Sequence, residues 1–130
     1  MRQSTRSASP YETAFGFSRA VRVGNRILVS GTAPVEPDGS STSGDAAAQT
    51  RRCFAIILAA IGELGGSAAD VVRTRMYLTD PADADRVGAV HGEIFGDVRP
   101  AATMVVVAAL LRAEWRIEIE AEALVGDETT

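Results

Sequence analysis

The stretch WRIEIEAEALV, residues 115–125, alternates charged and apolar side chains and is the strongest indication of the fold class. A period of two is typical of a β-strand with one face against a core. Ile117 and Ile119 are predicted to share one side of this strand. The other side takes a row of glutamates about 7 Å apart, namely Glu118, Glu120 and Glu122. This row is either a solvated face on an edge strand, or it places at least one carboxylate in a cleft, as a general base or the partner of an arginine.

Four more segments with strand character come earlier in the chain: 17–23, 27–29, 71–79 and 101–109. Gly24-Asn25 supplies a turn that joins the first two in a hairpin. Segment 101–109 is apolar on both faces, which indicates burial on both sides. Alternation divides segment 71–79 into two sides, with Val72, Thr74, Met76 and Leu78 on one and Arg73, Arg75 and Tyr77 on the other.

Two helices are predicted between these strands. The first runs from the N-cap candidate Asp45 to the stop Gly65-Gly66. The second starts at Asp80-Pro81, an N-cap followed by a proline at the first helical position, and ends at Gly96. The order ββαβαββ predicts an α+β fold, with a single mixed β-sheet and two helices on one face, in one domain over residues 1–130. Residues 1–14 are polar without periodicity and are expected to form a loose arm, and residues 126–130 a polar tail.

The face of the sheet that the helices leave uncovered indicates the quaternary state. Two helices cover only one face, and the apolar residues of segment 101–109 are expected to leave a contiguous apolar patch on the other. Soluble monomers rarely expose such a patch. We therefore expect sister subunits to cover this face, so that the chain assembles with itself.

Composition excludes several kinds of chemistry. The 13 basic residues are all arginine, and the absence of lysine excludes a Schiff-base mechanism and a lysine-dependent phosphate loop. One histidine and one cysteine do not make a Cys/His zinc site, so no metal is expected. A net charge of −4, scattered arginines and few aromatic residues disfavour nucleic-acid binding. No membrane partner is expected because no segment has the ~20 apolar residues of a span. The lone Cys53 points to a cytoplasmic location.

Several segments, in order and at sensible spacing, together resemble the reactive-intermediate deaminase family, also called Rid or YjgF. The matching segments are Gly16–Val21, Val23–Asn25, Val29–Gly31, Asp70–Val72, Tyr77–Asp80, Arg99–Ala101 and Ile117–Ala121. The resemblance implies a chorismate-mutase-like fold that assembles as a homotrimer, with ligand clefts between subunits. It also implies hydrolysis, without a cofactor, of reactive enamines and imines to a carbonyl compound and ammonia.

The resemblance assigns roles to individual residues. It implies that Ser30 and Gly31 line the cleft and that Glu118 handles the attacking water. Phe17 stands where the family usually has a tyrosine. Ala102 stands where it usually has the arginine that binds the substrate carboxylate, so an altered substrate range is expected. Two further departures are Gly88 in place of an asparagine and Met104 in place of a cysteine.

Four other candidates remain, and two of them, Arg75 and His91, have two readings each. Arg75 either takes over the role vacant at Ala102 or forms a structural ion pair with a glutamate of the last strand. His91 is either a satisfied, partly buried histidine or an acid/base group at the cleft edge. Cys53 on an apolar helix face is interpreted as core packing. Thr103 offers a hydroxyl that a ligand can use, as does Ser30.

Two functions therefore follow from the sequence. The first is a cofactor-free enamine or imine hydrolase with an altered substrate range. The alternative is a binding or sensing trimer that kept the cleft for a small molecule and lost the chemistry. An RNA-cleaving activity, attached to some members of the family, is disfavoured by the acidic net charge and the lack of a basic patch.

Overall fold

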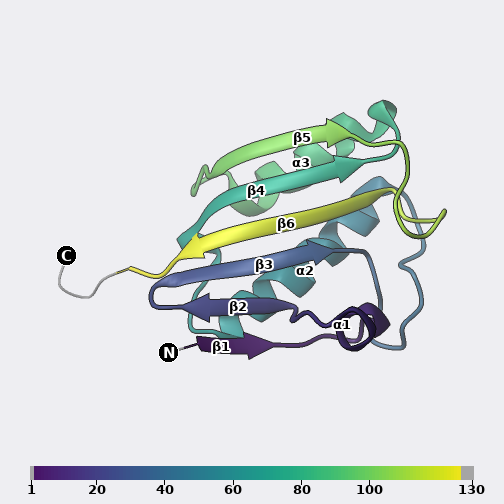
Figure 1. Ribbon diagram of the computed structural model, residues 1–130. Coiled ribbons are helices and arrows are strands. Elements are labelled where there is room, and N and C mark those ends of the chain that lie inside the picture. The colour runs from purple at the N-terminus through teal and green to yellow at the C-terminus, as the bar shows by residue number, and fades with distance from the viewer. Residues whose placement is uncertain (1, 127–130) are drawn as a thin grey trace.

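The computed structural model describes residues 2–126, and its centre is one six-stranded sheet (Figure 1). The strands, in their order across the sheet, are β1 (Arg2–Thr5), β2 (Ala20–Val23), β3 (Arg26–Thr32), β6 (Ile117–Leu124), β4 (Val71–Leu78) and β5 (Ala101–Val106). The pair β4 and β5 is parallel, and the other four neighbouring pairs are antiparallel. The predicted single mixed sheet is confirmed.

Strand β6 lies in the middle of the sheet, between β3 and β4. The edge-strand reading of the glutamate row is therefore wrong: Glu122, for example, lies opposite Leu28 of β3 and Arg73 of β4. The alternation itself is confirmed, since Ile117 and Ile119 are fully buried and the glutamates are half-buried. Sequence alternation fixes which way side chains face, whereas neighbouring strands depend on contacts that are distant along the chain.

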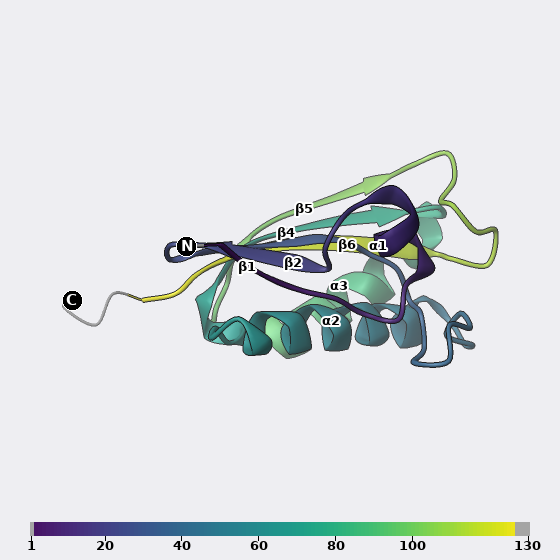
Figure 2. The same cartoon turned by 60° about the horizontal axis from the view of Figure 1, so that its bottom comes forward.

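Helices α2 (Ala46–Glu63) and α3 (Ala84–Phe95) cover the same face of the sheet (Figure 2). The carboxylate of Asp45 caps α2 by accepting from the backbone N–H of Ala48 at 3.0 Å, as predicted. The second predicted helix begins with a separate 3₁₀ turn, Pro81–Asp83, before α3. Cys53 is fully buried in the core between α2 and the sheet, which confirms its packing role. No helix in residues 2–126 has the length and apolar character needed to cross a membrane.

The expected loose arm is ordered instead. Residues 2–5 form β1, which pairs with β2, and Pro10–Phe15 form the short helix α1, capped by the side chain of Ser9. The segment lacks hydrophobic periodicity because a four-residue strand and a six-residue helix are held by pairing, capping and one buried ion pair. Of the predicted polar tail, all but Gly126 lies outside the described residues.

The open face of the sheet is mixed in character, and the expected contiguous apolar patch is wrong. Its centre is charged and polar: Arg75 forms an ion pair with Glu122 at 3.8 Å, and the Tyr77 hydroxyl donates to Glu120. Apolar side chains such as Leu28 and Val105 lie to either side. The cause is that β6 contributes its three glutamates to this face.

Two predictions for β4 and β5 also need correction. A bulge at residues 71–73 buries Val71 and leaves Val72 exposed, so Val72 does not share the buried side with Thr74. Strand β5 ends at Val106 and is an edge strand, mostly exposed within one chain. An edge strand has a neighbour on one side only, so its apolar composition does not by itself bury it.

Candidate functional site

A pocket of about 120 Å³ lies at the end of the sheet where β3 ends and β6 begins, next to α1. Its lining comes from segments far apart in sequence. It comprises Ser7, Ala8, Ser9, Tyr11, Phe15, Phe17, Arg19, Gly31, Ala33, Val35, Arg52, Ile56, Leu111, Trp115 and Glu118. Three of the residues predicted for the site, Phe17, Gly31 and Glu118, therefore meet in one pocket.

Glu118 is the carboxylate of this pocket. It points from β6 to the open side of the sheet, beside the irregular Ser30–Gly31 segment of β3. A Cβ atom at Gly31 would lie 2.5 Å from Oε2 of Glu118, so only glycine leaves room for the carboxylate there. Burial raises the pKa of Glu118, and the charge of Glu120 raises it further, while the nearby Arg19 cation offsets part of the rise. A carboxyl group of this kind can accept a proton nearer to neutral pH than an exposed glutamate.

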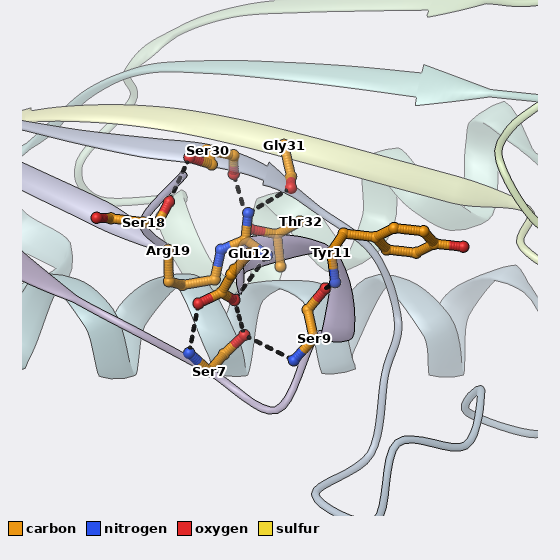
Figure 3. A network of polar contacts seen from close by, with 9 residues as sticks. All are labelled: Ser7, Ser9, Tyr11, Glu12, Ser18, Arg19, Ser30, Gly31 and Thr32. Carbon is orange, nitrogen blue, oxygen red and sulfur yellow. Dashed lines mark hydrogen bonds and ion pairs between the residues drawn. The ribbon is translucent and has the colours of Figure 1, made fainter. Parts of the chain in front are cut away.

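Arg19 holds the wall of the pocket in place (Figure 3). Its side chain is only 4% exposed, and Nη2 donates to the Gly31 carbonyl at 2.7 Å. Nη1 lies 3.7 Å from Oε2 of Glu12, and Glu12 in turn accepts from the backbone N–H of Ser7 at 2.9 Å. Burial lowers the pKa of Arg19, and the Glu12 and Glu118 carboxylates oppose that shift. The network ties α1 and the chain before it to the end of β3.

Ser30 and Phe17 flank this network. The Ser30 hydroxyl donates to the Ser18 carbonyl at 2.8 Å, which joins β3 to the start of β2 (Figure 3). Its hydroxyl is thus engaged within the chain, and Ser30 is not among the pocket-lining residues. The Phe17 ring is 37% exposed, with the guanidinium of Arg19 at 5.5 Å from its centre. The ring therefore forms part of the mouth of the pocket.

The other predicted site residues lie elsewhere in the chain. Arg75 forms an ion pair with Glu122 within the chain, as one of its two readings predicts, and Thr103 lies opposite it on β5. Ala102 lies opposite Thr74. Nε2 of His91 is 2.9 Å from the Thr74 hydroxyl.

The surroundings of His91 are those of a satisfied, half-buried histidine. Its ring packs at 5.8 Å from Phe54 and 5.0 Å from Phe95. Burial lowers its pKa, which favours the neutral ring. Within one chain, these four residues sit on β4, β5 and α3 and do not line the Glu118 pocket.

Sequence reasoning missed most residues of this site, among them Tyr11, Glu12, Arg19 and Trp115. Arg19 interrupts the apolar members of the 17–23 alternation, and a charged residue in a buried strand position is a signal that was available. Trp115 is the only tryptophan of the chain and opens the last strand segment. Tyr11 and Glu12 fall in the expected loose arm, where only the Ser9-Pro10 cap signal marked a helix.

No three His, Cys, Asp or Glu side chains come together as a metal site within the part of the chain that the structure describes. The charged groups of the pocket are instead one carboxylate, Glu118, and two arginines, Arg19 and Arg52. What this set can do chemically is position a water molecule and exchange protons with it beside a wall of aromatic rings.

The fold and the pocket define an α+β protein with one mixed sheet, helices on one face and a carboxylate site at the sheet's end. A family model described as Endoribonuclease L-PSP matches residues 7–125. The chain belongs to that family, the Rid/YjgF family, and has its chorismate-mutase-like fold.

Relatives with known sequence or structure support this family assignment. The crystal structure of Rv2704 from Mycobacterium tuberculosis, described as a YjgF/YER057c/UK114 family member, is 43% identical with a TM-score of 0.88, covering 96% of this chain and 100% of that one. RidA from an Antarctic Psychrobacter is 31% identical with a TM-score of 0.83, covering 95% and 97%. The 3-aminoacrylate deaminase RutC of Acinetobacter baylyi is 36% identical over 105 residues, 80% of this chain and 82% of that protein.

Proposed function

We propose that this protein is a cofactor-free hydrolase that converts a reactive enamine or imine to a carbonyl compound and ammonia. The observation that carries the proposal is the half-buried Glu118, whose pKa is raised, set against Gly31 in a pocket. The family relationship supports it, because one relative is named as a 3-aminoacrylate deaminase. Glu118 is the proposed catalytic residue.

The proposed reaction is a hydrolysis. An enamine first takes a proton at carbon and loses one from nitrogen, which converts it to the imine. The Glu118 carboxylate accepts a proton from water while the water oxygen bonds to the imine carbon, and the C=N electron pair moves to nitrogen, which gains a proton. The carbinolamine then expels ammonia: the C–N bond breaks, the hydroxyl loses its proton, and the C=O bond forms. The balance is imine plus water to carbonyl compound plus ammonia. Glu118 serves as base in the first half and returns the proton in the second.

The complete site in this proposal lies between subunits of a homotrimer. Glu118 and Gly31 are at the open side of the sheet, where a second copy can pack. That copy is proposed to bring Ala102, Thr103, Arg75 and His91 toward the cleft. Because Ala102 supplies no charge, this part of the cleft lacks the bidentate anchor for a substrate carboxylate.

The direct test is ammonia release from a panel of enamines and imines by Glu118→Gln. We expect a loss of roughly 100-fold or more, the range of general acid–base catalysis. Glu122→Gln is the matched control, since it changes a half-buried glutamate on the same face of β6, and it is expected to retain activity. Equal activity in the two variants would contradict the proposed role of Glu118.

The second candidate is a small-molecule binding or sensing trimer. It is favoured by Ala102 and Gly88, which replace the arginine and asparagine expected from the family resemblance. It predicts that a ligand raises the melting temperature, because it binds the folded state alone, while no ammonia is released. Ammonia release that depends on Glu118 would exclude it.

A further inference from the structure

The mouth of the Glu118 pocket is built from apolar side chains, several of them exposed. Phe15 is 66% exposed, Leu111 68% and Phe17 37%, although each is a large hydrophobic residue. The Tyr11 ring lies 5.2 Å from that of Phe15 and 6.3 Å from that of Trp115. We call these five residues the apolar mouth. Exposed apolar side chains gathered around one pocket mark a binding surface for an apolar group.

The two arginines of the pocket each contact a carboxylate and a backbone carbonyl within the chain. Arg19 is occupied by the Glu12 carboxylate and the Gly31 carbonyl. Arg52 donates from Nε to the Val35 carbonyl at 2.8 Å, and Nε is 3.8 Å from a carboxylate oxygen of Glu36. In the described lining of the pocket, both cations therefore have partners, whereas the Glu118 carboxylate lines the cavity without an ion-pair partner. A ligand carboxylate would meet the like charge of the Glu118 carboxylate.

A protonated imine fits these surroundings better than an anion does. Its positive charge is attracted to the Glu118 carboxylate. Its apolar group replaces water against the apolar mouth, which favours a bulky side chain over a methyl group.

We propose that the preferred substrate is an imine with an aromatic or bulky apolar group and no carboxylate, bound as the iminium cation. This inference rests on the proposed function and names its substrate class. The apolar group lies in the apolar mouth, and the C=N carbon lies at Glu118. The hydrolysis is that of the proposed function, except that the nitrogen of the iminium already carries its proton and gains none when water attacks. Its products are an apolar aldehyde or ketone, ammonia and the proton that the iminium brought in. The supplier of such an imine must be a reaction that oxidises an amine lacking a carboxylate.

The test uses four imines that vary the two features independently. A flavin-dependent amine oxidase forms phenylacetaldehyde imine from phenethylamine and ethanimine from ethylamine. An amino acid oxidase forms the corresponding carboxylated imines from phenylalanine and alanine, and catalase removes the peroxide. The protein's effect is measured as the fall in semicarbazone formed when semicarbazide competes for each imine.

We expect the acceleration of phenylacetaldehyde imine hydrolysis to exceed that of the other three by roughly tenfold or more, as for a well-filled apolar pocket. Greater acceleration of either carboxylated imine, or equal acceleration of ethanimine, leaves the hydrolase function standing and overturns the substrate class. Acceleration of none of the four overturns the proposed function, and the substrate class with it.

Variants of the apolar mouth give the second readout. Phe15→Ala and Leu111→Ala change exposed side chains, so both proteins are expected to fold with melting temperatures close to the parent. We expect each to lose several-fold of the acceleration with phenylacetaldehyde imine and little with ethanimine. Val72→Ala, which truncates an exposed valine outside the pocket, is the matched control. An equal loss for both imines, or the same loss in the control, would overturn the assignment of the apolar mouth.

Discussion

Glu118 shows how a single side chain links stability to chemistry. Burial raises the pKa of its carboxyl group, so the folded chain binds a proton at this site more tightly than the unfolded chain does. The contribution of Glu118 to stability is therefore present at low pH. It is lost as the pH rises from the ordinary glutamate pKa through the folded-state pKa. The ionised form, which the proposed reaction needs, is the form that destabilises the fold.

This linkage predicts that Glu118→Gln raises the melting temperature at about pH 7 by a few degrees relative to the parent. The glutamine keeps the size of the side chain but has no charge to desolvate. The gain is expected to shrink as the pH falls toward about 4, where the parent carboxyl is itself protonated. Thermal melts across this range are the measurement, with Glu122→Gln alongside. A gain that does not change with pH would contradict the explanation.

Gly31 is the second residue whose substitution tests the site, because it leaves room for the Glu118 carboxylate. In Gly31→Ala, the added methyl group occupies the place of the Glu118 carboxylate, 2.5 Å from Oε2, so Glu118 must turn away. We expect a loss of hydrolase activity of about tenfold or more, with a change in the free energy of unfolding of only ~1 kcal/mol, since the side chain that moves is flexible. Activity is measured by ammonia release and stability by urea unfolding. Unchanged activity in a folded variant would show that the carboxylate position does not matter.

Among the elements, α1 and β1 depend on a buried ion pair more than on apolar packing. Glu12 and Arg19 are nearly inaccessible to solvent and are 3.7 Å apart. Removing one partner leaves the other charge buried without its counter-ion, which costs more than removing both. The pair therefore controls whether residues 2–17 stay on the sheet.

Arg19→Met is accordingly expected to lower the free energy of unfolding by about 3 kcal/mol and to open residues 2–17 to limited proteolysis. The double variant Arg19→Met with Glu12→Gln is expected to recover part of that loss, since no unpaired charge remains. Urea unfolding of the two variants measures the coupling. A double variant at least as unstable as the sum of the single changes would contradict this role for the pair.

The elements that sequence predicts well are those with strong local signals. Helix α2 has an N-cap at Asp45 and a glycine stop, and β6 has an uninterrupted alternation, so both were predicted close to their observed bounds. The bulge that exposes Val72 leaves no local signal, because it arises from the pairing of β4 with β6. Helix α1 was missed because its stability comes from Arg19, which belongs to another segment.

On the scale of the whole molecule, the residues of the site also divide into those that the sequence predicts and those that it does not. Glu118 and Gly31 could be predicted from the family resemblance. The apolar mouth could not, because it brings together α1, the start of β2 and the loop before β6. Ala102 and His91 lie outside the pocket of one chain. They complete the site only if a second copy of the chain brings them to it.

For the whole molecule, we predict the oligomeric state in solution. Light scattering at micromolar concentration is expected to give a mass of about three times 13.6 kDa. Val105→Glu places a charge on the open face of β5, beside Tyr77, and is expected to shift the protein toward the monomer. Burying an unpaired charge between subunits is strongly unfavourable. A parent protein that scatters as a monomer, or a Val105→Glu variant that keeps the parent mass, would remove the trimer from the proposal.

The central place of β6 has a consequence during synthesis on the ribosome. The five other strands leave the exit tunnel first, and until residues 117–124 follow, β3 and β4 each expose an unpaired edge. During that interval the nascent chain can form the hairpin and the β4–α3–β5 unit but not a continuous sheet. Exposed strand edges favour aggregation. A chain that ends before residue 117 therefore lacks both the continuous sheet and Glu118.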